Sequence, residues 1–353
     1  LGDPAGIGSE LIARLLSQTD AAQHANIVLV GDLWLWTEGQ RIAGVQVSTV
    51  AVKSFSEVRE CADRHQPAWL AMDTVAQGDV VRGVAKAAGG ASVLAVLNAC
   101  MDAATRGEID AICFAPLNKF AMKQGGLLHD DELHHFAQYL GVTSYFCEFN
   151  TLGDLWTSRV SSHIPLKDAA SYLSKDRIKD ATRLIYRSLQ AAGFASPKVA
   201  VAAFNPHGGD GGTCGREEVD TIAPAVRELA DEGFPVGGPF PADTIFLKAR
   251  DGEYQAIVTM YHDQGQIAIK LMGFSKGVTV QGGLPVPITT PAHGTAYDIA
   301  GKGVADVNAT YNALRIAARM GTRPHAPPLR GSLPPEGAQP ALGRPGGGQP
   351  SSH

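Results

Sequence analysis

The chain has 353 residues, of which 44% are hydrophobic and 18% are charged, and its formal net charge is -5. This composition is typical of a globular enzyme, and the length is sufficient for two domains. The acidic balance gives no reason to expect nucleic acid or an anionic membrane as a partner. No apolar run approaches the roughly 20 residues that span a bilayer, so we expect a soluble, cytoplasmic protein.

Cysteine usage and the last residues set two further limits. The five cysteines are odd in number and widely scattered, which predicts reduced thiols and neither a disulfide framework nor a thiolate metal site. Residues 323–353 are rich in Pro, Gly and Ser and contain almost no large apolar side chain. Such a segment cannot bury a core, so we expect this tail to be disordered.

Strand and helix patterns alternate through the first third of the chain. A glycine-rich loop at 2–8 leads into a helix, and because such a loop normally follows a strand, we expect a strand before Leu1. The loop amides could cradle an anion, and a plain tight turn is an equal alternative. Strands are predicted at 27–30, 45–52, 68–72 and 109–115, with a long helix at 85–106. This alternation predicts an α/β fold with mainly parallel sheets.

Polar residues follow the predicted strand at 109–115. Lys119, at the end of this strand, suits a carboxylate or phosphate partner, and a plain surface lysine is an equal alternative. Asp130 is expected to cap a helix over 133–140, with the next two acidic residues favoured in its first turn by the helix dipole. The histidines inside this helix then lie on its flank. His129, just before the helix, is the better candidate for a ligand contact.

Three histidines each come directly after an apolar run of strand length: His163, His207 and His262. The carboxyl ends of parallel strands meet at one edge of a sheet, where α/β proteins commonly bind ligands. Three imidazoles without a neighbouring CxxC predict a metal site assembled by the fold. Three separate structural roles are the equal alternative.

The last third adds a carboxylate, a lysine and a second glycine-rich loop. Asp243 precedes an apolar segment, where it either caps a helix or lies near a metal, and Lys270 comes two helical turns beyond His262. The loop at 293–303 is dense in small residues and suits a nucleotide, because backbone can approach the ring and the Asp298 carboxylate can bond ribose hydroxyls. Further helices are predicted at 166–189, 217–231 and 309–320.

Six segments, taken together, resemble one enzyme family. They are GDPAGIGSE at 2–10, SHIPLKD at 162–168, FNPHGGDGG at 204–212, PADT at 241–244, YHDQGQ at 261–266 and HGTAYDIAGKG at 293–303. In this order and spacing they resemble the 4-hydroxythreonine-4-phosphate dehydrogenase family of pyridoxal phosphate synthesis and its catabolic relatives. The resemblance implies two α/β/α domains of the isocitrate/isopropylmalate dehydrogenase-like type, a cleft between them, and a homodimer with an active site shared between subunits.

The resemblance also implies how the chain is divided. Residues 1–125 plus 285–322 would form the domain with the cofactor loop, and residues 126–284 the domain with the metal ligands and the dimer interface. The metal ligands would be His163, His207 and His262, holding one divalent ion (Zn, Mg, Mn or Co). NAD or NADP would be held by His293, Gly294, Thr295, Ala296, Asp298, Gly301 and Lys302. The substrate contacts would be His129, Asp130, Lys270, Thr279 and Ile288.

The implied reaction is oxidation of a secondary alcohol, with hydride passing to NAD(P)+, followed by loss of CO2. The metal would act as a Lewis acid, and Lys270 would hold a carboxylate or hydroxyl of the substrate. Asp243 and Asp263 would orient ligands or relay the proton. A metal-dependent hydrolase or lyase is the rival from another class, and it predicts turnover without nicotinamide. A non-catalytic relative is the third alternative.

Departures from the family pattern bear on the substrate. The family's His-Thr pair is His129-Asp130 here, and its substrate-binding Asn and Arg are Thr279 and Ile288. A phosphate ester is usually met by a bidentate donor such as Arg, so these changes argue against a phosphorylated substrate. The segment PVPITTPAHGTA at 285–296 is similar to the catabolic branch that oxidises cis-dihydrodiol carboxylates, such as terephthalate dihydrodiol dehydrogenases. We therefore expect a cis-dihydrodiol carboxylate, with 4-phosphooxy-L-threonine or a 4-phospho-threonate or erythronate as the alternative.

Overall fold

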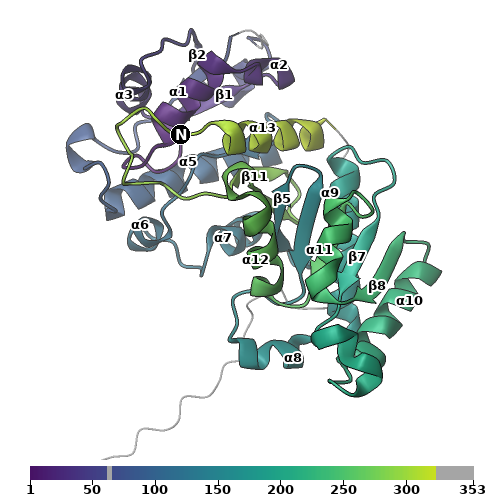
Figure 1. Cartoon of the computed structure of the whole chain (residues 1–353). Coiled ribbons are helices and arrows are strands. Elements are labelled where there is room, and N and C mark those ends of the chain that lie inside the picture. The colour runs from purple at the N-terminus through teal and green to yellow at the C-terminus, as the bar shows by residue number, and fades with distance from the viewer. Residues whose placement is uncertain (62–65, 323–353) are drawn as a thin grey trace, which may run out of the picture.

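The computed structural model describes residues 1–61 and 66–322, so the predicted tail at 323–353 lies outside the described residues. Two sheets organise the described chain (Figure 1). The smaller has three parallel strands in the order β1-β3-β2: β1 (Val28–Gly31), β2 (Val50–Val52) and β3 (Ala68–Ala71). Trp36 and Trp69 stack beside it with ring centroids 5.8 Å apart.

The larger sheet has eight strands in the order β4-β11-β10-β5-β6-β9-β7-β8. They are β4 (Ile112–Cys113), β5 (Cys147–Leu152), β6 (Leu155–Arg159), β7 (Val199–Ala202), β8 (Val236–Phe240), β9 (Ala256–Thr259), β10 (Val278–Gly282) and β11 (Ile288–Pro291). The β6-β9, β9-β7, β7-β8 and β4-β11 pairs are parallel, whereas the β11-β10, β10-β5 and β5-β6 pairs are antiparallel. The predicted α/β class is confirmed, with an antiparallel centre that alternation alone did not predict.

Along the chain, helices lie between the strands of both sheets. They are α1 (Gly8–Gln18), α2 (Ala21–His24), α3 (Leu33–Ala43), α4 (Phe55–Val58), α5 (Ala87–Thr105), α6 (Lys119–Gln124), α7 (Glu132–Tyr139), α8 (Ala169–Tyr172), α9 (Lys175–Ala191), α10 (Ala223–Asp231), α11 (Ala242–Arg250), α12 (His262–Gly273) and α13 (Asn308–Gly321). Alternate residues of β7 face opposite sides: Val199 and Val201 pack with α9 and α10, whereas Ala200 and Ala202 pack with α11. Both faces of this strand are therefore core, which explains its continuous apolar run.

Helix α5 is long and apolar enough to cross a membrane by length and composition alone. Half of the qualifying window is buried, and Val93, Leu97 and Met101 pack into the same core as Phe114 and Phe136. These contacts make α5 part of the hydrophobic core.

Several predicted elements are shorter or broken. The predicted strand at 45–52 is reduced to β2, and the one at 109–115 to β4. The predicted helix at 166–189 is split, because Ser174 caps a new helix by accepting a hydrogen bond from the Arg177 amide. The predicted cap Asp130 is wrong by one residue: Asp131 accepts the bond from the His134 amide that begins α7.

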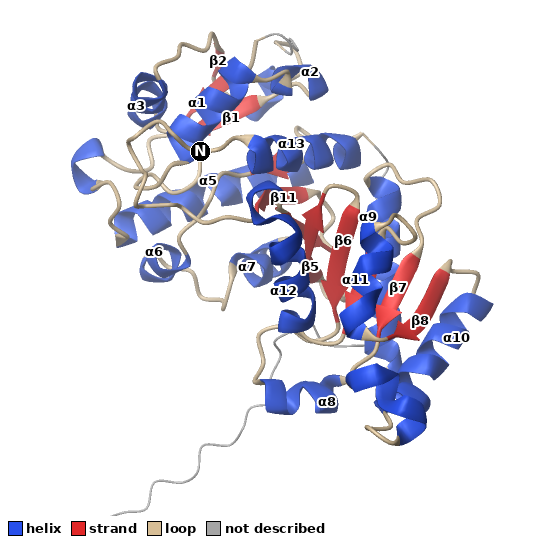
Figure 2. Cartoon of the chain, in the orientation of Figure 1, coloured by secondary structure: helices blue, strands red, loops and turns tan. Residues whose placement is uncertain are grey.

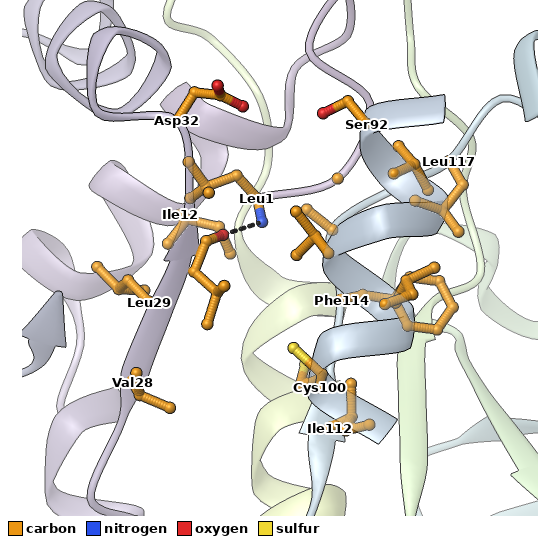
Figure 3. A pocket seen from close by; sticks show the side chains of 18 of the residues that line it. Leu1, Ile12, Val28, Leu29, Asp32, Ser92, Cys100, Ile112, Phe114 and Leu117 are labelled. Carbon is orange, nitrogen blue, oxygen red and sulfur yellow. Dashed lines mark hydrogen bonds between the residues drawn. The ribbon is translucent and has the colours of Figure 1, made fainter. Parts of the chain in front are cut away.

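An apolar cavity of about 120 Å³ lies where the two sheets approach one another (Figure 3). It is lined by β1, α5 and β4, and both strands are edge strands of their sheets. The Leu1 amine donates a hydrogen bond to the Val30 carbonyl at 3.3 Å across it. Burial raises the pKa of the Cys100 thiol in its wall to about 11. All five cysteines are free, as predicted.

Candidate active site

The three strand-end histidines follow three adjacent strands. Strand β9 lies between β6 and β7 and is parallel to both, so the carboxyl ends of these strands meet at one edge of the sheet. His262 is the first residue of α12, and its helix packs in front of the sheet beside α11 (Figure 2). Gln264 fixes the turn, because its side chain accepts from the Met260 amide and donates to the Ala203 carbonyl at the end of β7.

His163 and His262 lie together, with ring centroids 5.7 Å apart. The Nδ1 of His262 is 2.7 Å from a carboxylate oxygen of Asp263. A carboxylate at this position favours a proton on Nδ1, which leaves the Nε2 lone pair available to a proton or a metal ion. The two imidazoles have the donor chemistry of a divalent metal site.

Asp131 connects His163 to helix α7. Its carboxylate accepts from the backbone amide of His134, lies 2.7 Å from the Nδ1 of the same residue and lies 3.7 Å from the Nδ1 of His163. Burial opposes ionisation of Asp131, but the hydrogen bonds from the two histidines outweigh it and hold the pKa of this carboxyl well below its usual range. Asp131 is therefore an anchor for the His163 ring, and no feature of the sequence pattern distinguished it from Asp130.

His207 is not gathered with the other two histidines. It is exposed in a loop where five consecutive residues, 207–211, have positive φ. Such a conformation costs energy for a non-glycine residue, and buried Glu218 holds the loop by accepting hydrogen bonds from the Phe204 and Asn205 amides. Within the residues that the structure describes, no group of three or more His, Cys, Asp or Glu side chains could hold a metal ion.

A polar pocket of about 160 Å³ opens beside His262. Three residues predicted from the sequence line it: His262, Lys270 and Thr279. The lining residues that were missed include Glu148 and Asn150 on β5, Arg159 at the end of β6, and Gln266 on α12.

The predicted cofactor loop at 293–303 is fastened to the first helix. Glu10 on α1 is fully buried, and its carboxylate accepts hydrogen bonds from the amides of Gly301 and Gly303 at 2.8 and 3.1 Å. The Thr295 carbonyl accepts from the Ile7 amide at 3.2 Å. The glycine-rich start of the chain and the 293–303 loop therefore form one unit.

A half-buried tyrosine and a buried aspartate join the same two segments. The Tyr297 hydroxyl donates to the Asp3 carboxylate at 2.7 Å. Burial, together with this hydrogen bond, raises the pKa of Tyr297 above its usual range, and burial also raises the pKa of Asp3.

The amino-acid sequence that builds this site matches one protein family. The sequence profile described as "Pyridoxal phosphate biosynthetic protein PdxA" matches residues 23–317. The chain belongs to the PdxA family. A protein of Pseudomonas aeruginosa named "Putative 4-hydroxythreonine-4-phosphate dehydrogenase 2" is 51% identical over 325 residues, which cover 91% of this chain and 95% of that protein. The D-threonate 4-phosphate dehydrogenase of Cupriavidus necator is 35% identical, with 92% of this chain and 96% of that protein covered.

Solved PdxA-family structures have the same fold. A 4-hydroxythreonine-4-phosphate dehydrogenase from Burkholderia phymatum superposes with a TM-score of 0.77 at 32% identity, covering 90% of this chain and 96% of that one. A terephthalate 1,2-cis-dihydrodiol dehydrogenase from Burkholderia xenovorans gives 0.65 at 28% identity, with the same coverage. The PdxA relatives are named dehydrogenases, so the chain is assigned to the oxidoreductases, and dehydrogenases in general use a nicotinamide cofactor.

Two residues on which the substrate argument depended do not face the pocket. Ile288 is fully buried and packs in the core with Phe114 and Phe136, because it occupies the face of β11 opposite Thr289, whose hydroxyl bonds to α13. The Asp130 side chain is 89% exposed and lies 3.6 Å from the Lys123 amine. Neither residue lines the pocket beside His262, so the argument from Ile288 and Asp130 against a phosphorylated substrate loses its support.

The other predicted contacts of this PdxA-family chain are dispersed. Asp243 is exposed in the first turn of α11, and His129 lies beside His135 with ring centroids 6.1 Å apart. Lys119 does meet a carboxylate, since its amine is 3.5 Å from Glu132. Burial disfavours its charge, but the neighbouring carboxylates raise the pKa of Lys119. The roles of these side chains in binding or catalysis stay predictions.

Proposed function

We propose that this chain is an NAD(P)-linked dehydrogenase that oxidises the secondary alcohol of a phosphorylated four-carbon hydroxy acid. The substrate class is that of 4-hydroxythreonine 4-phosphate or D-threonate 4-phosphate. The observation that carries the proposal is the pocket beside His262, which presents the cationic side chains of Lys270 and Arg159. Cations in a confined site favour an anionic substrate.

The phosphorylated class replaces our expectation of a cis-dihydrodiol carboxylate. That expectation depended on Ile288 and Asp130, whose side chains lie in the core and in solvent. The relatives at 51% and 35% identity are named for 4-hydroxythreonine 4-phosphate and D-threonate 4-phosphate, whereas the dihydrodiol dehydrogenase is 28% identical. The dihydrodiol remains the second arm of the test.

A divalent ion, Zn, Mg, Mn or Co, forms part of the proposal. His163 and His262 fit it as two ligands, because their ring centroids are 5.7 Å apart and a carboxylate lies beside the Nδ1 of each ring. When bound, the ion would supply Lewis-acid stabilisation of negative charge on the substrate oxygen. His207 does not reach these rings within one chain. We therefore propose a homodimer in which the site is completed at the subunit boundary.

The side chains of this chain would bind and orient the substrate. Lys270 would pair with an anionic group and fix the carbon skeleton. The carbinol carbon then gives its hydride to the nicotinamide, and the hydroxyl proton leaves to a basic group beside it. Asp263, hydrogen bonded to His262, is the proposed relay for this proton, and Asp243 is proposed to orient ligands from α11. If the hydroxyl is β to a carboxylate, the ketone product is a β-keto acid and loses CO2.

The nicotinamide cofactor is proposed to bind along the 293–303 loop. The Glu10 carboxylate holds the backbone of this loop in place. Gly294, Asp298 and Lys302 are exposed on it. Exposed carboxylate and backbone groups suit ribose hydroxyls and phosphates. Free cysteines are consistent with the reducing cytoplasm, where we place the protein.

The test is NADH or NADPH formation by the purified chain with a divalent ion and each substrate in turn. We expect turnover with a phosphorylated hydroxy acid. Turnover only with a cis-dihydrodiol carboxylate would contradict the substrate class. Turnover of any substrate without nicotinamide would favour the hydrolase or lyase alternative.

A further inference from the structure

Arg159 is a charged residue in a buried position. It ends β6, whose other four residues are also buried, and only 4% of its surface is exposed. It nevertheless lines the polar pocket together with Lys270 and His262. A buried guanidinium cannot lose its proton, so the fold must hold it with acceptors.

Three acceptors fix the guanidinium in one orientation. Its Nε donates to the Ser162 hydroxyl at 2.9 Å, one Nη donates to the Asn150 side-chain oxygen at 2.8 Å, and the other donates to Glu148 at 3.0 Å. A guanidinium carries five N–H groups, so these bonds use three and leave one hydrogen on each Nη. Two donors on neighbouring nitrogens suit a bidentate oxyanion such as a carboxylate or phosphate.

The acceptors themselves belong to the walls of the pocket. Asn150 donates to the Thr279 hydroxyl at 3.3 Å and accepts from Gln266, which joins β5 to β10 and α12. Glu148 is more open than its partner, with a side chain 26% exposed against 5% for Arg159. Arg159 is therefore the more deeply buried member of the ion pair. Its hydrogen bonds fix the guanidinium before a ligand binds.

Stability alone is a weak reason for this arrangement. An ion pair taken out of water is often no more stable than apolar side chains of the same volume, because desolvation cancels the attraction. Arg159 also shares the pocket with a second cationic side chain, Lys270. A guanidinium held in one orientation at the wall of a polar pocket is an arrangement that favours an anionic ligand.

We propose that Arg159 is a substrate-binding residue that, with Lys270, forms an oxyanion subsite for a carboxylate or a phosphate. This inference rests on the proposed function, because the substrate class is taken from it. The binding of an anion can be measured without catalysis, so the two claims can fail separately.

The experiment is calorimetric titration of the full chain with two probes. Glycerol 3-phosphate carries a phosphate without a carboxylate, and threonate carries a carboxylate without a phosphate. Arg159→Met is expected to weaken one probe about 10- to 100-fold, the effect of losing charge-assisted hydrogen bonds in a buried site. The probe that is weakened identifies the group that Arg159 binds. Arg183→Met, which breaks the α9 ion pair with Glu232, is the matched control and should change neither.

A second variant keeps the test decisive if Arg159→Met does not fold. Glu148→Gln leaves the guanidinium in place and removes the charge that neutralises it, so anion affinity should rise severalfold. If the Arg159–Glu148 ion pair is purely structural, the two variants should behave alike. Both would then lower the affinity for the anion by disturbing the fold, or neither would change it. That result, or failure of the wild type to bind either probe, overturns the subsite. A wild type that binds a probe but oxidises no phosphorylated hydroxy acid contradicts the proposed function and leaves the subsite standing.

Discussion

Single side chains decide how the histidines are oriented, and Asp131 has the largest part. It caps α7 and contacts the rings of His134 and His163 with one carboxylate. Its neighbour Asp130 has the same chemistry but lies in solvent. One residue of displacement along the chain therefore separates an anchor from a surface charge.

Asp131→Ala is expected to lower the free energy of unfolding by about 1–2 kcal/mol, because a helix cap is lost. It should also weaken divalent metal binding roughly 10- to 100-fold, because the His163 ring loses its orienting carboxylate. Denaturant titration and metal titration measure the two effects. Asp130→Ala is the matched control, and equal losses in both variants would contradict the role assigned to Asp131.

Motifs located some site residues and missed others for physical reasons. His262, Lys270 and Thr279 were predicted from the resemblance, and they share a pocket. Arg159 was missed because its acceptors Glu148 and Asn150 come from the neighbouring strand, and only strand pairing brings them together. Ile288 was misjudged because a motif gives a position along a strand but not the face on which the side chain lies.

At the scale of elements, buried carboxylates join segments that are distant in sequence. Glu10 on α1 holds the 293–303 loop through two backbone amides, and Tyr297 in this loop donates to Asp3. The glycine-rich start of the chain was expected to cradle an anion or to make a plain turn. In the structure it packs against the loop that we propose for the cofactor.

Glu10→Gln should raise the KM for the nicotinamide cofactor, because an amide nitrogen placed toward the loop amides cannot accept their hydrogen bonds. Leaving these two amides without an acceptor costs about 1–3 kcal/mol. If cofactor binding must restore the loop conformation, this cost corresponds to a roughly 5- to 150-fold higher KM. Steady-state kinetics with varied NAD+ measures the effect. Glu60→Gln, at an exposed position, is the control. An unchanged KM in Glu10→Gln would show that the loop does not bind the cofactor.

Helices α9 and α10 are joined by surface charges whose contribution depends on pH. Hydrogen bonds from Lys175 and Lys179 lower the pKa of Glu228 from 4.5 to about 2. A pKa that is depressed in the folded state stabilises the fold above the unfolded value, and this contribution is lost as the pH falls toward about 2.

Glu228→Gln should therefore be less stable than the wild type at pH 7, with a smaller difference at pH 3. The effect should be modest and should shrink further at high salt, because the carboxylate is exposed. Urea midpoints at the two pH values measure it. A difference that is unchanged or larger at pH 3 would contradict the assigned pairing.

For the whole molecule, composition and alternation were sufficient to predict the α/β class but not the order of strands. The parallel part of the large sheet, β6-β9-β7-β8, follows from buried runs separated by helices. The antiparallel centre arises because β5 and β6 form a hairpin and β10 pairs with β5, and the β10-β5 pairing joins segments that are distant in sequence. This sheet contains strands from both predicted domains, and the division into 1–125 plus 285–322 and 126–284 stays a prediction.

The central claim concerns the reaction of the assembled protein, and the rate of NADH formation from a phosphorylated hydroxy acid tests it most directly. Wild-type protein with a divalent ion should produce NADH, and His262→Ala should lower kcat/KM by at least about 100-fold, the scale of losing one metal ligand or catalytic group. His24→Ala, which removes a histidine that bonds to Tyr311 outside the pocket, should leave the rate unchanged. A wild type that forms neither NADH nor NADPH from either phosphorylated compound, or a His262→Ala variant as active as His24→Ala, would contradict the account.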